Sequence, residues 1–269
     1  MIRIVFALLI LALPAAAQER IPSHCLALAG EIPGASYVHL AAWSDPLPAG
    51  EVRISYIDHA SFLIQTEDGL AAVTDFTGNL GGADLVPDVV TMNNAHITHF
   101  THAPDPRIAH VLEGWSAGGA AAEHRLDLGG MLVRNVPTDL RGRGGGVVEN
   151  GNSIFVFEAA GLCIGHLGHL HHEPDPAQYA AIGRLDVVMA AVDGGITLDT
   201  ASMIRVMQRF KARVVLPMHW FGRSTLGRFL DGMSGEFDVV ETGMREITLS
   251  LDKLPARPTV MVLEPGRLD

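Results

Sequence analysis

The stretch Val89-Val90-Thr91-Met92-Asn93-Asn94-Ala95-His96-Ile97-Thr98-His99 guides the interpretation of the whole sequence. An apolar segment typical of a buried strand runs into a short polar loop that carries two histidines. Loops that follow buried strands often carry the chemistry of α/β proteins, and histidine is the commonest metal ligand among side chains. A His-x-x-His pair is as typical of hydrogen bonding at the start of a helix, so this pair alone does not establish a metal site.

Two later stretches have the same form. Gly165-His166-Leu167-Gly168-His169 and Leu216-Pro217-Met218-His219 each follow an apolar, β-like run. Three strand ends that each carry histidine predict one site assembled from three parts of the chain.

The composition limits the class of protein. The chain has 269 residues, of which 48% are hydrophobic and 18% charged, so it can bury a large core. Its formal net charge of -11 argues against nucleic acid as a partner, because phosphate contacts need clustered lysine and arginine. A small-molecule substrate is the expected partner, and the sequence does not indicate the oligomeric state.

Residues 1–17 have the pattern of a secretory signal. Arg3 precedes the apolar run from Ile4 to Leu13, and Ala15-Ala16-Ala17 forms a small-residue cleavage site. We therefore expect a periplasmic or secreted protein that is cleaved near Ala17 and has no stable membrane insertion afterwards. An uncleaved anchor is the alternative. Residues 18–50 read as an extended lead-in, and residues 51–269 as a single domain.

Cys25 and Cys163 are the only cysteines. Export permits a disulfide between them. Cys163 lies in an apolar strand-like run, however, where a free cysteine is commonly a small buried hydrophobe, and we favour that reading.

Hydrophobic periodicity predicts hairpins first and then strands that alternate with helices, which indicates a layered α/β architecture. Two strands are expected within 52–65, with a break near Asp58-His59. The other predicted strands are 70–74, 85–91, 131–136, 153–158, 162–165, 187–192 and 213–216. The predicted helices are 176–182, a helix that begins near Asp199-Thr200, and a short one at 108–113.

The order of these motifs resembles the metallo-β-lactamase fold over about residues 51–222. The resemblance depends on several stretches in the same order as in that family. They are Ile54 to Ile64 around His59-Ala60-Ser61, Thr74-Asp75, the opening histidine loop, Gly151-Asn152-Ser153, His166-Leu167-Gly168, Gly194-Gly195 and Pro217-Met218-His219. Within the fold, the sequence is most similar to the ascorbate-phosphate-lactonase-like metal-dependent hydrolases. The resemblance implies a four-layer αββα sandwich with the site at one edge of two facing sheets.

The sequence departs from the family's metal motif at several positions. The family pattern His-x-His-x-Asp-His reads Asn94-Ala95-His96-Ile97-Thr98-His99 here, so Asn94 replaces a histidine and Thr98 an aspartate. The next family histidine has no counterpart near Thr138-Asp139-Leu140. His169 stands where the family has a bridging aspartate. His219 is retained.

These departures disfavour a dinuclear centre. Two divalent ions repel strongly without the two carboxylates, and a neutral imidazole does not normally bridge two metals. We therefore predict a single divalent ion, zinc before copper, nickel or iron, held by His96, His99, His169 and His219. Three histidines and one water suit catalysis, whereas four histidines close the site and favour a binding or structural role.

Other side chains have further candidate roles, and those of His59, Asp75 and His172 follow from the same resemblance. His166 and Asp139 are candidates for a proton shuttle, with a hydrogen-bonded turn histidine and a surface aspartate as the alternatives. Asp75 is expected to orient a ligand histidine. His59 either orients substrate or hydrogen-bonds backbone, and Trp220 and Phe221 are expected in the core rather than at the pocket wall. Asn94, Thr98 and His172 complete the expected pocket residues.

The sequence therefore predicts an exported metal-dependent hydrolase of a small ester, lactone, amide or phosphoester. The alternative is a degenerate member of the fold that binds metal or ligand without turnover.

Overall fold

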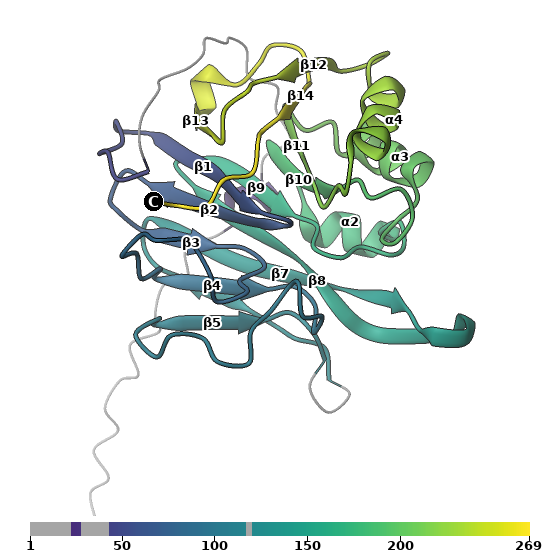
Figure 1. Cartoon of the computed structure of the whole chain (residues 1–269), viewed down its shortest axis with the longest axis horizontal. Helices are drawn as coiled ribbons and strands as arrows, with labels where there is room; N and C mark the ends of the chain where they lie inside the picture. The colour runs from purple at the N-terminus through teal and green to yellow at the C-terminus, as the bar shows by residue number, and fades with distance from the viewer. Residues whose placement is uncertain (1–22, 28–42, 117–119) are drawn as a thin grey trace, which may run out of the picture.

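The computed structural model describes residues 23–27, 43–116 and 120–269. Two β-sheets lie face to face, and helices cover the outer face of one of them (Figure 1). The predicted signal at 1–17 and most of the lead-in at 18–50 lie outside the described residues. In the described part of the chain, no helix has the length and apolar character needed to cross a membrane.

The first sheet has six strands in the order β13-β1-β2-β3-β4-β5. Its members are β1 (Glu51–Asp58), β2 (Ser61–Thr66), β3 (Ala71–Val73), β4 (Val89–Met92), β5 (His110–Glu113) and β13 (Glu246–Ser250). Strands β1, β2 and β3 form an antiparallel meander, and β3, β4 and β5 then run parallel.

The second sheet has eight strands in the order β12-β14-β11-β10-β9-β8-β7-β6. Its members are β6 (Arg125–Asp127), β7 (Met131–Arg141), β8 (Val147–Ala159), β9 (Leu162–His166), β10 (Val187–Ala191), β11 (Val214–Met218), β12 (Asp238–Glu241) and β14 (Thr259–Val262). Strands β9, β10, β11, β14 and β12 are parallel to one another. The long β7–β8 hairpin projects from the body as an arm (Figure 1).

The helices begin where the sequence supplies capping residues. α2 (Pro176–Ile182) has a capping box in which Asp175 accepts from the backbone of Gln178, and the Gln178 side chain accepts in return. α3 (Thr200–Phe210) begins after Asp199, whose side chain accepts from Ser202 N. These two of the three predicted helices are confirmed. α1 (His24–Ala27) and α4 (Arg223–Met233) complete the described helices, with short 3-10 turns at Arg143–Gly145 and Leu251–Lys253.

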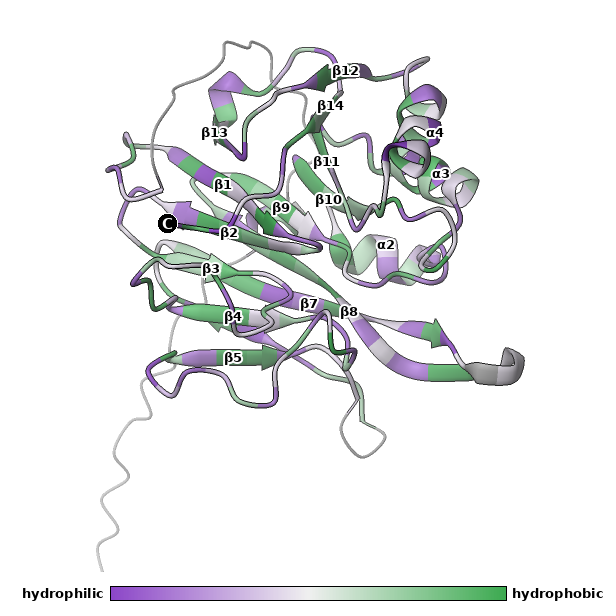
Figure 2. Ribbon diagram, viewed as in Figure 1, coloured by the Kyte–Doolittle hydropathy of each residue, from purple (hydrophilic) through white to green (hydrophobic). Residues whose placement is uncertain are grey.

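Three apolar layers hold these elements together. The first lies between the sheets and includes Phe62, Phe155 and Met189. The second packs the helices onto the second sheet through residues such as Met203 and Phe229. Figure 2 shows β10 and β11 coloured hydrophobic along their length, as expected for parallel strands that are buried on both faces, whereas β1 alternates.

The third layer covers the outer face of the first sheet. There Val73, Val90 and Met92 pack against Phe76, Leu80, Ile108 and neighbouring loop residues. The expected sandwich of two sheets is confirmed. Among the described residues, loops rather than a helix cover this second outer face.

One secondary-structure prediction is wrong. Residues 108–113 were expected to form a short helix, but His110–Glu113 is strand β5, which pairs in parallel with β4. The segment is too short for its periodicity to distinguish a helix from a strand, and the pairing with β4 decides the outcome.

The prediction that Cys163 is a free, buried cysteine is also wrong. Cys25 and Cys163 form a disulfide that links α1 to β9 across 138 residues of sequence. Cys163 is fully buried, as a free hydrophobic cysteine would be, so burial alone did not distinguish the two states.

A buried ion pair lies beside this bridge. Arg134 Nε donates to Glu158 Oε1 at 2.8 Å, and its two terminal nitrogens donate to the carbonyl oxygens of Ala181 and Ile182 at the end of α2. Ser23 Oγ donates to the same carboxylate oxygen. The pair therefore connects the N-terminal segment, the second sheet and α2.

We expect Glu158→Gln to lower the free energy of unfolding by roughly 3 kcal/mol, because it leaves the buried Arg134 without its counter-charge. Burial raises the pKa of Glu158, but Ser23 and Arg134 outweigh burial and hold that pKa below its ordinary value of 4.5. A carboxylate with a lowered folded-state pKa stabilises the protein above its unfolded pKa, and that contribution is lost as the pH falls through the folded value.

The difference in stability between wild type and Glu158→Gln should therefore shrink on acidification below pH 4.5. Urea unfolding at several pH values measures it, with the exposed Glu123→Gln as the control. A difference that does not depend on pH would contradict this assignment.

Candidate metal centre

The candidate site lies at one edge of the two sheets. Asp75 follows β3, the loop with His96 and His99 follows β4, and His59 sits in the β1–β2 hairpin. From the second sheet, His169 follows β9, Asp193 follows β10 and His219 follows β11. Strands β1, β3 and β4 run in the same direction in the first sheet, as do β9, β10 and β11 in the second. Their carboxyl ends therefore place all of these side chains at a common edge.

Three histidines form the centre of the site. The ring nitrogens that His59, His99 and His219 offer lie within 4.8 Å of one another. His99 Nε2 faces His219 Nε2 at 3.2 Å, and the ring centroids of His59 and His219 are 3.9 Å apart. We call these three residues the histidine trio.

Two members of the trio each face a buried carboxylate. Asp75 Oδ2 lies 2.7 Å from His99 Nδ1, and its other oxygen accepts from Asn93 N at 2.9 Å. Asp193 Oδ2 lies 3.0 Å from His219 Nδ1. A carboxylate accepts but does not donate, so each Nδ1 carries a proton and each Nε2 presents its lone pair.

Asp193 is held by its own loop. Its carboxylate accepts from the backbone nitrogens of Gly195, Ile196 and Thr197 at 2.9, 2.7 and 3.0 Å. Burial alone would raise the pKa of Asp193, but the hydrogen bonds from His219 and this loop outweigh it and hold the pKa far below its usual range. The Asp193 carboxylate is therefore ionised throughout the neutral range.

The backbone is held in an uncommon conformation at three of these positions. His59, Asp75 and His219 have positive φ angles of 45°, 42° and 58°. Residues other than glycine adopt this region at a cost, and such residues cluster at functional sites. The conformation is supported locally, because His219 N donates to His59 O at 2.8 Å and Tyr56 donates its hydroxyl to the same oxygen at 2.6 Å.

The trio fits a divalent transition metal. Two Nε2 lone pairs that face each other at 3.2 Å repel unless a cation or a shared proton lies between them. His59 Nε2 is buried and has no hydrogen-bond partner among the described residues. Burial, with the charges of His219 and His99, lowers the pKa of His59 to about 4, so its ring is neutral at pH 7, as a ligand must be.

The comparison with known proteins identifies the family of the chain. The sequence model of the beta-lactamase superfamily domain matches residues 53–219. The chain belongs to this superfamily. A UPF0173 metal-dependent hydrolase from Anaeromyxobacter sp. (strain K) is 24% identical over 259 residues, which is 81% of this chain and 86% of that protein. A second, from Carboxydothermus hydrogenoformans, is 24% identical over 63% of this chain and 84% of its own length.

Solved structures share the architecture. A protein from Thermotoga maritima, named as a zinc-dependent hydrolase of the metallo-β-lactamase superfamily, matches with a TM-score of 0.56 and 25% identity, covering 79% of this chain and 98% of that one. Igni18, a metallo hydrolase from Ignicoccus hospitalis, matches with a TM-score of 0.53 and 17% identity over 80% and 96% of the two chains. The second likeness concerns the fold alone.

The four predicted ligands of this superfamily member divide into two pairs. His99 and His219 belong to the trio. His96 is exposed, and its Nδ1 lies 3.0 Å from Thr98 Oγ1, while its ring centroid is 5.9 Å from that of His99. His169 is buried with its ring centroid 4.8 Å from that of His99, but it stays outside the trio. The structure therefore brings a ring nitrogen of His59, rather than one of His96 or His169, within 4.8 Å of those of both His99 and His219.

The two proton-shuttle candidates have structural contacts. His166 is fully buried, its Nε2 donates to Ala60 O at 2.7 Å and its Nδ1 accepts from Gly168 N at 3.2 Å. Both ring nitrogens are occupied, so we withdraw His166 as a shuttle in favour of the turn-histidine alternative. Asp139 is half-buried and accepts from Asn150 N at 2.8 Å within the β7–β8 arm. It thus has a structural contact and is less exposed than the surface aspartate given as the alternative.

Among the expected pocket residues, Asp75 and Asn94 are buried, whereas Thr98 and His172 are exposed. Asp75 makes the contact with His99 that was expected of it. Asn94 is buried and its Nδ2 lies 3.1 Å from His169 Nδ1. Thr98 and His172 are exposed, and Thr98 contacts His96 alone among the predicted ligands.

Sequence reasoning missed two members of the site. His59 was assigned to the pocket rather than to the metal, because a single histidine in a hairpin carries no spacing signal. Asp193 was overlooked. It lies just after the buried strand β10 and before Gly194-Gly195, and a polar residue at the end of a buried strand is a recognisable signal of a site.

Exposed apolar side chains border the site. Phe221 is 66% exposed, and its ring centroid lies 5.3 Å from that of His219 and 5.5 Å from that of His59. Its expected place in the core was therefore wrong, whereas Trp220 packs against the apolar layer beneath the helices. Ile97 and Ile196, in the loops that carry His99 and follow Asp193, are 79% and 57% exposed.

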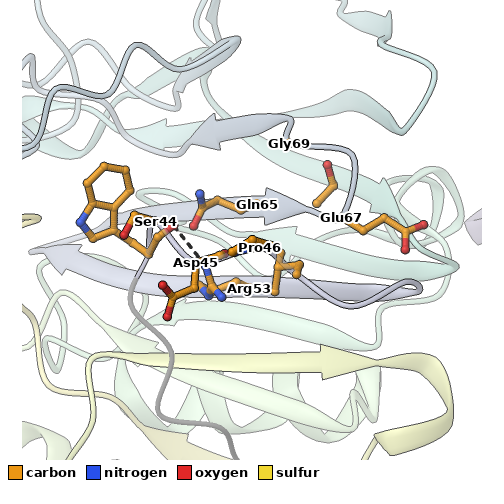
Figure 3. Close-up of a pocket in the computed structure, with 10 residues that line it drawn as sticks. Ser44, Asp45, Pro46, Arg53, Gln65, Glu67 and Gly69 are labelled. Atoms are coloured by element: carbon orange, nitrogen blue, oxygen red, sulfur yellow. Dashed lines mark hydrogen bonds between the residues drawn. The ribbon is translucent and has the colours of Figure 1, made fainter.

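A separate pocket lies over β1 and β2, away from the histidines (Figure 3). It has a volume of about 310 Å³ and is lined by Trp43, Asp45, Arg53, Gln65 and neighbouring residues. Arg53 donates to the carbonyl oxygens of Trp43 and Asp45 at 3.1 and 2.9 Å. The guanidinium thus anchors the segment that leads into β1.

The geometry predicts different effects for two histidine variants. His59→Ala should weaken zinc binding by at least about 10-fold, because it removes a nitrogen donor, whereas His96→Ala should leave affinity nearly unchanged. Competition with a chromogenic chelator at pH 7.5 measures both, and unfolding of the metal-free variants checks that each is folded. A loss of affinity in His96→Ala equal to that in His59→Ala would contradict the trio.

Proposed function

We propose that the protein is an exported metal-dependent hydrolase that cleaves a small ester, lactone, amide or phosphoester with a metal-activated water at a mononuclear site. The observation that supports this most directly is the pair of opposed Nε2 atoms, each backed by a carboxylate, with His59 beside them. The names of the UPF0173 relatives, which are metal-dependent hydrolases, support the same reaction class.

The donor set supports one zinc ion. Its three donors are all imidazole nitrogens, which suit zinc and other late transition metals rather than magnesium or calcium. The nearby carboxylates of Asp75 and Asp193 face Nδ1 atoms and are occupied there. Three protein ligands leave a coordination position open, which favours catalysis over the alternative of a closed, non-catalytic site.

The residues around the ion have distinct tasks. When bound, the ion polarises the scissile carbonyl or phosphoryl oxygen and lowers the pKa of a water molecule. Asp75 and Asp193 fix the tautomers of His99 and His219 and thereby aim their Nε2 lone pairs at one point. The hydrogen bonds to His59 O hold the β1–β2 hairpin against His219.

Two further features support the remaining parts of the proposal. The signal pattern at residues 1–17 and the Cys25–Cys163 disulfide both suit a periplasmic or secreted location, because disulfides persist in oxidising compartments. The motif order supports a place in the ascorbate-phosphate-lactonase-like branch.

A screen of metal-loaded protein against ester, lactone, amide and phosphodiester substrates tests the reaction class. We expect His99→Ala and His219→Ala to lower kcat/KM by more than about 100-fold, beyond the range typical of residues that only orient a ligand. The exposed His102→Ala is the matched control and should retain activity. Turnover that survives in both variants would remove the metal from the mechanism.

The rim predicts the character of the substrate. Phe221, Ile97 and Ile196 would cover an apolar group next to the reacting bond, so Phe221→Ala should raise KM about 10-fold for a hexanoyl ester and leave an acetyl ester nearly unaffected. Steady-state kinetics with both esters measures the shift, and Val240→Ala, an exposed apolar residue in β12, is the control. An equal change for the two esters would show that Phe221 does not contact the acyl chain.

A further inference from the structure

Two of the departures from the family's metal motif are in contact with each other. Asn94 stands where the resemblance places a histidine, and His169 where it places a bridging aspartate. Asn94 Nδ2 lies 3.1 Å from His169 Nδ1, and the two side chains are both buried. The two replacements therefore form one unit rather than two independent losses.

This contact fixes the tautomer of His169. An amide nitrogen donates hydrogen bonds and does not accept them, so His169 Nδ1 is the acceptor and the proton of the neutral ring is on Nε2. His99 and His219 are in the opposite state, because carboxylates at their Nδ1 atoms leave the Nε2 lone pairs free. An Nε2–H group has no lone pair for a metal, which agrees with the position of His169 outside the trio.

The backbone around His169 is held firmly. His169 N donates to Asn152 Oδ1 at 2.8 Å, and the amide of Asn152 donates to Thr138 Oγ1 at 2.8 Å. Gly168 has a φ of +60°, and a Cβ at this position would lie 2.6 Å from Asn93 Cβ and from Asn152 Oδ1. Only glycine allows the loop to approach Asn93 and Asn152 this closely.

The His169 ring lies beside the trio. Its centroid is 4.8 Å from that of His99 and 5.3 Å from that of His219. The described residues supply no hydrogen-bond acceptor for Nε2, although they fix Nδ1 through Asn94. A fixed N–H next to a metal centre is the arrangement that stabilises negative charge as it develops on a reacting oxygen.

We propose that His169 is not a metal ligand but a neutral hydrogen-bond donor, which Asn94 orients so that Nε2–H meets the carbonyl or phosphoryl oxygen of the substrate. This role rests on the proposed hydrolase function. The donor keeps its proton throughout, and its hydrogen bond strengthens as the oxygen gains charge in the transition state.

The tautomer can be measured without any substrate. Long-range proton–nitrogen correlation spectra of the full mature chain, labelled with ¹⁵N-histidine, should show His169 as the Nε2–H form both without metal and with zinc, with His169→Gln used to assign the signal. A His169 signal of the Nδ1–H form, or a zinc-coordinated Nε2, would overturn the proposal. These spectra report the tautomer of His169 even if the protein hydrolyses none of the substrates tested. A failure of the proposed hydrolase function can therefore be told apart from a failure of the proposed role of His169.

Asn94→Asp provides a sharper test of the same contact. The new carboxylate can only accept a hydrogen bond, so the proton of the His169 ring should move to Nδ1. His169 Nε2 would then present a lone pair. We expect zinc affinity to stay equal or rise and kcat to fall as far as in His169→Ala. An unchanged tautomer and an unchanged kcat in Asn94→Asp would contradict the role of Asn94.

Substitutions of His169 separate donation from metal binding. His169→Ala should bind one equivalent of zinc with nearly unchanged affinity and lower kcat by about 100-fold, the effect typical of losing one such donor, with little change in KM. His169→Gln retains an N–H group and should recover part of kcat. Loss of zinc from His169→Ala would identify His169 as a ligand and overturn the proposal.

Discussion

A single row of contacts, Asp75–His99···His219–Asp193, connects the two sheets at their common edge. Asp75 and His99 belong to the first sheet, and His219 and Asp193 to the second. Both carboxylates are buried, which is costly unless each is well hydrogen-bonded. Their partners meet this requirement, and in doing so they direct two lone pairs toward each other. The two lone pairs repel unless a cation or a shared proton lies between them, so the fold creates a place that favours a cation.

Neutral imidazoles have two different roles at this edge of the sheets. A carboxylate neighbour leaves Nε2 as an acceptor, whereas the amide of Asn94 leaves His169 with Nε2 as a donor. The identity of the residue behind each ring therefore decides whether that ring binds a cation or donates a hydrogen bond. The replacement of the family's carboxylate by His169 therefore exchanges a metal ligand for a hydrogen-bond donor.

Much of the architecture could be predicted because it depends on local pattern. The continuous apolar runs of β10 and β11, the capping residues of α2 and α3, and the break at Asp58-His59 were all legible in the sequence. Strand β5 was not, because four residues carry too little periodicity and their state is decided by pairing with β4. The pairing of Cys25 with Cys163 depended in the same way on two segments meeting across 138 residues.

The sequence by itself determined that histidines at strand ends would gather at one edge, since parallel strands bring their carboxyl ends together. It also indicated that two acidic ligands of the family were gone. Only the tertiary structure decided which of the thirteen histidines meet. His59 rather than His96 meets His99 and His219. His59 and His219 both have left-handed backbone conformations, and their ring centroids are 3.9 Å apart, but backbone angles of this kind leave no trace in residue spacing.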